Sequence, residues 1–406
     1  MIRLDALPSQ QRRAIELIRE TAAEKNLRPF LVGGPVRDLL LGRSVIDLDF
    51  TLEEGSSALA RAVSKRINGR VRSYPQFLTY KVTADEFPEI DIATARSEKY
   101  RAPGALPSVS EGSLQDDLLR RDFSINAIAL DVLSEQLHDP ASGKQDLDRK
   151  VIRVLHDESF IDDPTRIHRA IRLGARLGFT IESHTQELMR NAIRGDVLRS
   201  VSRERLWREL FLAFEEENAP AVILALSDAG ALDVLFGPRQ IDRERVEHAQ
   251  QIAKSDPALD REVLFIAALL HGNASPVDLE GSGFSQRRAR NVVQIANELG
   301  RFSDALAEAT TERQRFKLLK HASPELLAVL TSSAGEHVAR FRDYQNFRIP
   351  LRGTDLEVPV GPHIAKALER TREAVFMGEI TLDEARSFAQ RMAIKYLNRE
   401  QVSDIK

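Results

Sequence analysis

The sequence of 406 residues contains no cysteine. This absence excludes disulfide bonds and thiolate metal sites, and it fits a reducing compartment. Long hydrophobic runs are missing as well, because no apolar stretch approaches the roughly 18 residues that span a membrane. The N-terminal stretch, residues 1–20, is charged and amphipathic and lacks the apolar core of a signal peptide. We therefore expect a cytoplasmic protein that has no membrane partner.

A large net charge is also lacking. Lysine and arginine together number 58, and aspartate and glutamate together number 61, which gives a formal charge of -3. This balance neither requires nor excludes a nucleic-acid partner, because a local basic face can lie on a nearly neutral protein. The length is too great for one ordinary core and predicts roughly two to four domains.

Up to about residue 150, the hydrophobic pattern alternates between helix and strand. Apolar residues spaced three and four apart predict helices, and alternating ones predict strands. The predicted helices are residues 8–26, 35–41, 56–68 and 114–121. The predicted strands are residues 29–32, 45–52, 71–73, 78–83 and 89–94. Residues 96–113 contain two prolines and two glycines, and they are predicted to form a long loop.

Beyond residue 150, the sequence is typical of helices almost throughout. The first of these helices begins with Asp163 as the N-cap and Pro164 in the first turn. Further helices are predicted at residues 182–194, 202–216, 219–229, 242–255, 261–271, 286–299, 303–309, 311–321, 323–333, 336–347, 362–376 and 382–396. The predicted fold class is therefore α+β, with a small mixed αβ head followed by a long all-helical region.

One stretch, Leu31–Phe50, joins a glycine turn, a short helix and a strand that carries two acids. Asp47 and Asp49 share one face of that strand, because strand side chains repeat every two residues. Asp91 lies on another predicted strand and supplies a third carboxylate. Hard oxygen ligands of this kind suit Mg²⁺, so the sequence predicts a magnesium site at these acids.

Four motifs resemble, in order, those of the class II tRNA nucleotidyltransferase and bacterial poly(A) polymerase family. They are GGPVRDLLLGRSVIDLDF (33–50), RRDFSINAIA (120–129), DDPTRIHRAIR (162–172) and VSRERLWREL (201–210). The second half of the chain matches only loosely, near residues 352–369. The resemblance implies a head like that of the DNA polymerase beta nucleotidyltransferases. One departure is Asp162, where many members of the family have glutamate.

The resemblance also implies roles for individual residues. Asp47 and Asp49 would hold metal ions, and Asp91 stands where some members carry a third catalytic carboxylate. The nucleotide-binding residues would be Gly33, Gly34, Arg37, Arg121, Asp122, Asn126, Asp163, Arg166, Arg169 and Arg172. In the helix, positions 163, 166, 169 and 172 lie three apart, close to one face. An acid that accepts and a guanidinium that donates can meet the Watson–Crick edge of C or A.

The implied activity is tRNA nucleotidyl transfer. A CMP or AMP unit would pass from CTP or ATP to the 3′ hydroxyl of tRNA, and pyrophosphate would leave, with Mg²⁺ as the cofactor. The implied partners are the 3′ end and acceptor arm of tRNA, CTP and ATP, and no obligatory protein partner is evident. The expected division is a catalytic head (1–150), a neck with the base-reading helix (151–215), a body (216–280) and a tRNA-binding tail (281–406).

Several alternatives stay open at this point. The chain could add C and A, only C or only A, and the loop at 96–113 resembles those of members that add A alone. It could also be a poly(A) polymerase, although the C-terminal QVSDIK carries no long basic extension. A non-catalytic RNA-binding protein with a relic head is a further reading, which the intact Asp47 and Asp49 disfavour. The loop is expected to be either disordered or a mobile lever over the active site.

Basic residues of the predicted tail admit two readings. They could form a solvated face, or they could contact tRNA phosphates and make binding depend on salt. These residues are Arg287, Arg288, Arg290, Arg313, Arg315, Lys317 and Lys320. In the neck, Trp207 is expected in the core, and Glu204 and Arg205 are expected in structural ion pairs.

Overall fold

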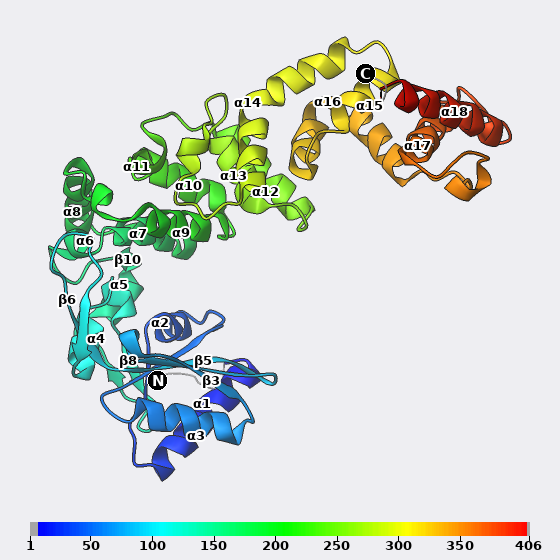
Figure 1. The fold of residues 1–406 in the computed structure, drawn as a ribbon. Helices are drawn as coiled ribbons and strands as arrows, with labels where there is room; N and C mark the ends of the chain where they lie inside the picture. Colours follow the sequence, from blue (N-terminus) through cyan, green and yellow to red (C-terminus); the bar gives the residue numbers. More distant parts are fainter. Residues whose placement is uncertain (1–6, 404–406) are drawn as a thin grey trace. The chain divides into compact units, whose positions relative to one another are not determined.

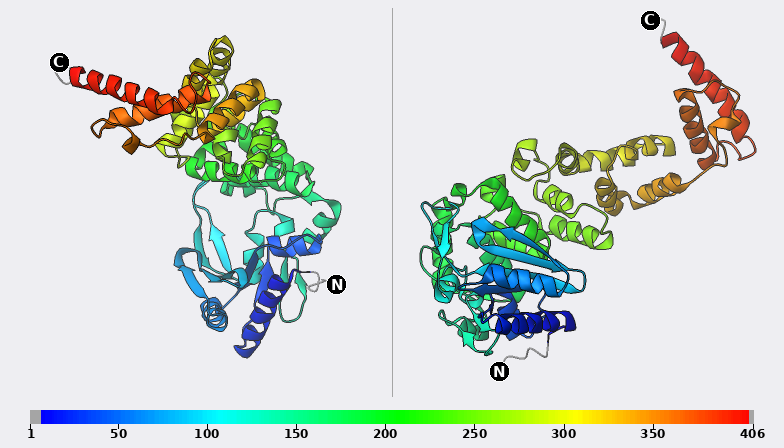
Figure 2. Two further views of the ribbon diagram at one scale, coloured as in Figure 1. Left: turned by 90° about the vertical axis from the view of Figure 1, so that its right-hand side faces the viewer. Right: turned by 60° about the horizontal axis from the view of Figure 1, so that its bottom comes forward.

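A computed structural model describes residues 7–403 of the chain. The chain divides into two compact units. The first is Met1–Arg243 with Val277–Gly283, and the second is Glu244–Pro276 with Phe284–Lys406. In the first unit, a mixed sheet is followed by helices, and the second unit is helical (Figures 1 and 2). The predicted α+β class is therefore confirmed.

The sheet of the first unit has seven strands in the order β3-β4-β5-β2-β1-β8-β9. The strands are β1 (Phe30–Val32), β2 (Leu48–Leu52), β3 (Arg70–Tyr74), β4 (Thr79–Ala84), β5 (Phe87–Thr94), β8 (Ala129–Asp131) and β9 (Leu137–His138). Only β2 and β5 run parallel, and their register pairs Asp49 with Asp91. The two acids therefore lie side by side at the centre of the sheet.

Helices cover both faces of this sheet. Helices α1 (Ser9–Glu24) and α3 (Ser56–Arg66) lie on one face, and α2 (Gly34–Leu40) lies on the other (Figure 1). Apolar residues spaced three and four apart turn one side of α1 toward the sheet, and Ile15 and Ile18 are buried there. Each such side chain stabilises the fold by roughly 2 kcal/mol relative to exposure.

The strand predicted at residues 45–52 is shorter than expected. It begins at Leu48, so Asp47 lies in the preceding loop and not on the strand. The reason is the lack of a partner: β1 pairs only with Phe50 and Thr51, and β5 begins its pairing at Leu48. The alternating pattern of residues 45–47 therefore has no neighbouring strand to bond.

The long loop predicted at residues 96–113 is also wrong. Strand β6 (Arg96–Lys99) pairs with β7 (Ser108–Glu111) in an antiparallel hairpin, and only residues 100–107 connect them. Hydroxyl groups help to hold the two strands, because Ser97 and Ser110 are hydrogen-bonded at 2.9 Å. The hairpin is polar and carries no apolar alternation, which is why the pattern did not reveal it.

Helices make up most of the remaining first unit. They are α4 (Leu114–Leu119), α5 (Gly143–Arg149), α6 (Ser159–Asp162), α7 (Thr165–Leu177), α8 (Ser183–Arg194), α9 (Arg203–Phe214), α10 (Ala219–Asp228) and α11 (Asp233–Phe236). Helix α7 packs against α9 and α10, and Trp207 is buried, as expected. A short parallel pair, β10 (Val151–Ile152) and β11 (Thr180–Ile181), interrupts the predicted all-helical stretch.

The second unit contains the remaining helices of the described chain. They are α12 (Arg243–Ser255), α13 (Arg261–Leu269), α14 (Gln286–Glu308), α15 (Glu312–Leu319), α16 (Pro324–Asn346), α17 (Pro362–Phe376) and α18 (Ala385–Ser403). Helix α14 replaces two predicted helices, because it continues through Gly300. Helix α16 also joins two predicted ones, but it bends at Ala334, where φ is -138° and ψ is 36°.

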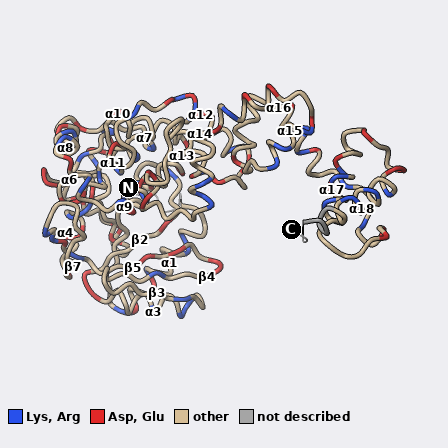
Figure 3. Tube along the Cα trace, turned by 45° about the horizontal axis from the view of Figure 1, so that its top comes forward, with Lys and Arg blue, Asp and Glu red and all other residues tan. Residues whose placement is uncertain are grey.

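Charges of both signs are spread over the chain (Figure 3). Within residues 7–403, no helix combines the length and the apolar character that a membrane crossing needs. The four-part division predicted from the sequence stays a prediction, because the structure separates the chain into two units only.

Candidate active site

The three acids expected at the catalytic site lie on, or just before, the central strands β2 and β5. Asp49 and Asp91 are half-buried register partners, and Asp47 is exposed in the loop before β2. Burial, together with the negative charges of Asp91 and Asp47, raises the pKa of Asp49 to about 6. Within residues 7–403, no three His, Cys, Asp or Glu side chains form a ready-made metal site. The acids are therefore brought near one another without being closed into a ligand cage.

Asp91 shows the same crowding. Burial raises its pKa, although the Lys81 ammonium lies 3.7 Å away and acts in the opposite direction. Its Oδ1 atom is buried and has no hydrogen-bond partner within the described structure. A cation bound by Asp49 and Asp91 would relieve both unfavourable features, so these residues fit a divalent metal ion.

Two cavities meet at Asp49. The first, of about 300 Å³, is lined by Gly34, Pro35, Arg37, Asp38, Ser44, Val45, Ile46, Asp47, Asp49, Asp122, Asn126, Arg169, Arg172, Leu173 and Arg176. The second, of about 420 Å³, is lined by Gly33, Gly34, Asp49, Arg96, Glu98, Tyr100, Arg120, Arg121, Asp122, Asn126, Asp163, Arg166 and Arg169. The structure thus gathers every predicted nucleotide-binding residue around one continuous site, with Asp49 in the shared wall.

Asp122 is the centre of the shared wall. Its Oδ2 accepts hydrogen bonds from Nε and Nη2 of Arg169 at 3.0 and 2.6 Å, and its Oδ1 accepts from Asn126 Nδ2 at 2.9 Å. Burial would raise the pKa of Asp122, but Arg169 and Asn126 lower it well below its usual range. Arg37 extends this hydrogen-bond network, because its Nη1 donates to Asn126 Oδ1 at 2.7 Å. One line of hydrogen bonds therefore joins α2, the turn after α4 and α7.

Gly33 is required by its conformation and by its neighbour. Its φ is 73°, a region that other residues rarely adopt, and it directly precedes α2. A Cβ atom built there would lie 2.6 Å from Nη1 of Arg121. Arg121 itself is held by Asp117, whose Oδ2 accepts from its Nη2 at 2.9 Å. The absence of a side chain at position 33 thus makes room for the Arg121 guanidinium in the second cavity.

Asp163 and Arg166 line the second cavity but already have partners. Asp163 Oδ1 accepts hydrogen bonds from the backbone N–H of Thr165 at 3.1 Å and from Arg205 Nη2 at 2.8 Å. Arg166 is buried and donates to Ser159 Oγ at 2.6 Å and to the carbonyl of residue 120 at 2.8 Å. Both side chains are therefore fixed before any ligand arrives.

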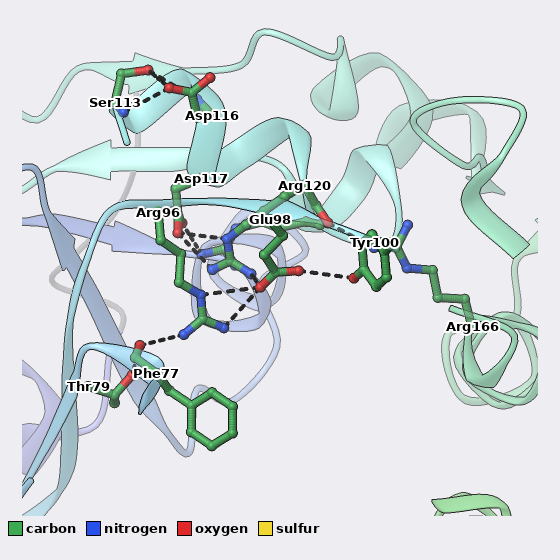
Figure 4. Close-up of polar contacts among 11 residues, drawn as sticks. Phe77, Thr79, Arg96, Glu98, Tyr100, Ser113, Asp116, Asp117, Arg120 and Arg166 are labelled. Carbon is green, nitrogen blue, oxygen red and sulfur yellow. Dashed lines mark hydrogen bonds and ion pairs between the residues drawn. The ribbon is translucent and has the colours of Figure 1, made fainter. Parts of the chain in front are cut away.

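The hairpin contributes a second charged cluster to this cavity, shown in Figure 4. Glu98 Oε1 accepts from Arg120 Nη1 at 2.9 Å and from Arg96 Nε at 3.2 Å. Its Oε2 accepts from the Tyr100 hydroxyl at 3.0 Å. Burial, with the Glu98 charge, raises the pKa of Tyr100 to about 12. Sequence reasoning missed Glu98 and Tyr100 because the hairpin was expected to be a loop.

The tip of the hairpin docks on the helices of the same unit (Figure 2). The Gly104 N–H donates to the Ile161 carbonyl at 3.3 Å, and Arg205 Nη1 donates to the Gly104 carbonyl at 2.7 Å. Arg205 was expected in a structural ion pair, and it indeed pairs with Asp163. The same guanidinium therefore joins the hairpin tip to an expected base-reading carboxylate.

The basic residues that could bind RNA in the second unit lie on and beside α14 and α15, and some of them have acidic partners. Arg288 pairs with Asp260 at 2.7 Å, and Arg313 pairs with Glu373 at 3.0 Å. Other members are Arg287, Arg290, Arg315, Lys317 and Lys320. Four of the seven, Arg287, Arg288, Arg290 and Lys320, line one groove of about 1040 Å³ beside α14 and α16. RNA binding by these residues stays a prediction.

Two family models match the first unit. Residues 29–153 match the poly A polymerase head domain. Residues 178–243 match the model described as the probable RNA and SrmB- binding site of polymerase A. The first match covers the sheet and both β6 and β7, and it includes the three acids and the Gly33–Gly34 turn.

Relatives named A-adding tRNA nucleotidyltransferase match most of the chain. The protein from Geobacter sulfurreducens is 30% identical over 91% of this chain and 46% of its own length. The protein from Halalkalibacterium halodurans is 33% identical over 70% of this chain and 69% of its own length. Proteins named multifunctional CCA protein also match, over 52% to 59% of this chain. The chain spans about half the length of the first two relatives, 46% and 40%.

A solved structure called a tRNA-processing enzyme (apo form I) has the same fold. It is 27% identical, its TM-score is 0.73, and the match covers 91% of this chain and 99% of that one. The resemblance inferred from the four motifs is therefore confirmed over most of the chain. The chain belongs to the family of tRNA nucleotidyltransferases that carry a poly A polymerase head domain.

Proposed function

We propose that this protein transfers a nucleotide from ATP or CTP to the 3′ hydroxyl of tRNA and releases pyrophosphate. The observation that carries the proposal is the meeting of two cavities at Asp49. Asp163 and Arg166, which suit a nucleobase, line one cavity only, and Asp49 stands in the wall between the two. A nucleotide whose base lies in the second cavity would present its α-phosphate at that wall, where a primer hydroxyl could attack.

Nucleotidyltransferases generally use divalent metal ions, and we propose Mg²⁺ for this chain. Asp49 and Asp91 would hold it with Asp47, because their carboxylates are crowded and Asp91 Oδ1 lacks a partner within residues 7–403. When bound, the ion would help to deprotonate the attacking hydroxyl and neutralise phosphate charge. The exposed position of Asp47 allows it to approach the ion by loop movement.

Asp163 and Arg166 would select the base without a nucleic-acid template. Within the described residues, Asp163 accepts side-chain and backbone hydrogen bonds through Oδ1, so Oδ2 is the oxygen that would accept from the exocyclic amino group of A or C. Arg166 would donate to a ring nitrogen of the same edge. Arg121, Asp122 and Asn126 would meet the ribose and phosphates. The Asp163 and Arg166 side chains are held in place by the protein. A base other than A or C would therefore leave their donor and acceptor groups unpaired.

Within this reaction, addition of A alone is the form that the observations favour. The relatives that match most of the chain bear the name A-adding tRNA nucleotidyltransferase. The segment ARSEKYRAPGALPSV (95–109), which contains β6, the turn and the start of β7, also departs from the loops of enzymes that add all of CCA. We therefore propose ATP as the main nucleotide and tRNA ending in CC as the acceptor, with the tail helices contacting the tRNA.

The test uses tRNA transcripts that end before CCA, after its first C and after its second C. Each is incubated with ATP or with CTP, and the products are separated at single-nucleotide resolution. The proposal expects one A on the transcript that ends in CC, and no C on the others. Addition of C would indicate a CCA-adding enzyme, and a long homopolymer would indicate a poly(A) polymerase. Absence of any transfer would contradict the proposed activity.

A further inference from the structure

A row of charged side chains leads from the acids of the site to the edge of the sheet. Register pairing places Asp49 of β2 beside Asp91 of β5, and Asp91 beside Lys81 of β4. Lys81 in turn pairs with Arg72 of the edge strand β3. Paired positions in a sheet direct their side chains to the same face. Because neighbouring strands are about 4.8 Å apart, Arg72 lies roughly 14 Å from Asp49 on the face that carries the acids.

The outer end of this row is positively charged. Arg70 and Arg72 are two residues apart on β3, so they share one face of the strand, and both are exposed. Neither arginine has an acidic partner among the described residues. Lys81, by contrast, is paired with Glu89 and lies 3.7 Å from Asp91. The charge that this face offers to an anion therefore comes from the two arginines of β3.

Aromatic side chains accompany these arginines. The Arg72 guanidinium lies over the Tyr74 ring, 5.2 Å from its centroid, and Tyr74 is the next residue of β3 on that face. Phe77 follows in the turn after β3 and is 44% exposed. Its carbonyl accepts a hydrogen bond from Nη1 of Arg96 at 2.5 Å (Figure 4), and Arg96 lines the second cavity. Phe77 is therefore an exposed ring beside that cavity.

The glycine turn and its helix lie on the other side of the acids. In the sheet, β1 and β8 are on one side of β2, whereas β5, β4 and β3 are on the other. Gly33 and Gly34 follow β1, and α2 packs on β1 and β2. Helix α3 packs on β3, β4 and β5 from the opposite face of the sheet (Figure 1). The route to Asp49 along β3, β4 and β5 is therefore left for a second substrate.

We propose that the β3 face, which consists of Arg70, Arg72 and Tyr74 together with Phe77, binds the unpaired 3′ end of tRNA. This inference rests on the proposed function, because the bound strand ends at the hydroxyl that attacks near Asp49. The two arginines contact phosphodiester groups, and the aromatic rings stack on bases. Stacking requires bases without pairing partners, so the occupant is a single strand and not the duplex stem.

The test measures how labelled tRNA ending in CC binds to the full-length protein, by fluorescence anisotropy at several salt concentrations. The same tRNA without its unpaired 3′ nucleotides is measured in parallel. Arg70→Ala combined with Arg72→Ala removes the phosphate contacts, and Phe77→Ala removes a stacking surface. Arg61→Ala combined with Lys65→Ala is the matched control, because both residues are exposed on α3, on the opposite face of the sheet.

The arginine double variant should raise Kd for tRNA ending in CC about tenfold. It should also lower the slope of log Kd against log salt by about 1.4, since each phosphate contact with a single strand contributes about 0.7.

Phe77→Ala should raise Kd about fivefold or more at an unchanged slope. Both variants should bind the shortened tRNA as wild type does, which also shows that they are folded. The proposal is overturned if the variants bind tRNA ending in CC as the control does, or if they lose equal affinity for the shortened tRNA. Because binding is measured without ATP, a wild type that binds in this way but transfers no nucleotide would refute only the proposed function.

Discussion

Removal of the Arg169 side chain tests whether its ion pair with Asp122, in the wall that both cavities share, stabilises the fold. Asp122 is 8% exposed and receives two hydrogen bonds from this guanidinium. Breaking a buried ion pair costs about 3–5 kcal/mol, because a charge is left without compensation. Arg169 is 43% exposed, and without it Asp122 keeps Asn126 and the Phe123 N–H as donors. We therefore expect Arg169→Ala to lower the free energy of unfolding by the smaller of these amounts, about 3 kcal/mol.

The loss should also depend on pH in a defined direction. In wild type the pKa of Asp122 is lowered, so the pair stabilises the fold above the unfolded pKa of about 3.9. In Arg169→Ala burial dominates and should raise that pKa above the unfolded value. As the pH falls, Asp122 of the variant would then bind a proton on folding. The loss of unfolding free energy in the variant, relative to wild type, would become smaller.

Urea unfolding of wild type, Arg169→Ala and the control Arg190→Ala at about pH 7.5 and about pH 5 measures both effects. Arg190 is an exposed arginine of α8 outside both cavities. We expect the difference between wild type and Arg169→Ala to be smaller at the lower pH. A difference below about 1 kcal/mol at neutral pH, or an equal difference at both pH values, would refute the buried-pair reasoning.

Three further predictions concern other residues of the first unit. Gly33→Ala should raise KM for ATP, because φ of 73° is strained for alanine and its Cβ would lie 2.6 Å from Arg121 Nη1; an unchanged KM would show that Arg121 yields freely. His168 is buried with its pKa lowered from 6.5 to about 4, chiefly by burial. Between those values the unfolded chain binds more protons, so stability should fall by about 3 kcal/mol as pH drops through this window. Urea unfolding of His168→Leu should show a flatter pH dependence, and an equal slope would contradict the assignment. Asp163→Ala should change the ratio of ATP to CTP incorporation more than KM for tRNA; unchanged discrimination would refute its role in base selection.

Several parts of the site follow from local sequence pattern. The alternation around Asp49 and in EIDIAT predicted two strands with acids on one face, and the structure pairs Asp49 with Asp91. The Asp-Asp-Pro start predicted the beginning of the helix before Arg166 to within one residue: Pro164, not Asp163, is the N-cap, α7 starts at Thr165, and Asp163 is extended just before it. These features depend on residues close in sequence, which is why pattern reasoning reaches them.

Other parts depend on residues far apart in sequence. Asp47 is off the strand because β1 is too short to pair with residues before Phe50. The role of Glu98 arises from Arg120, which lies 22 residues away along the chain. Arg176 approaches Glu216, in the connection between α9 and α10, to 4.0 Å. No local period encodes such long-range partners, so only the fold reveals them.

The most direct test of the central claim is nucleotide transfer by wild type and Asp49→Asn. Both proteins are incubated with Mg²⁺, labelled ATP and tRNA ending in CC, and folding is checked by circular dichroism. The account predicts that wild type adds one A and that the folded variant adds none, because the substitution removes a carboxylate from the wall shared by both cavities. Transfer by the variant at the wild-type rate would contradict the account.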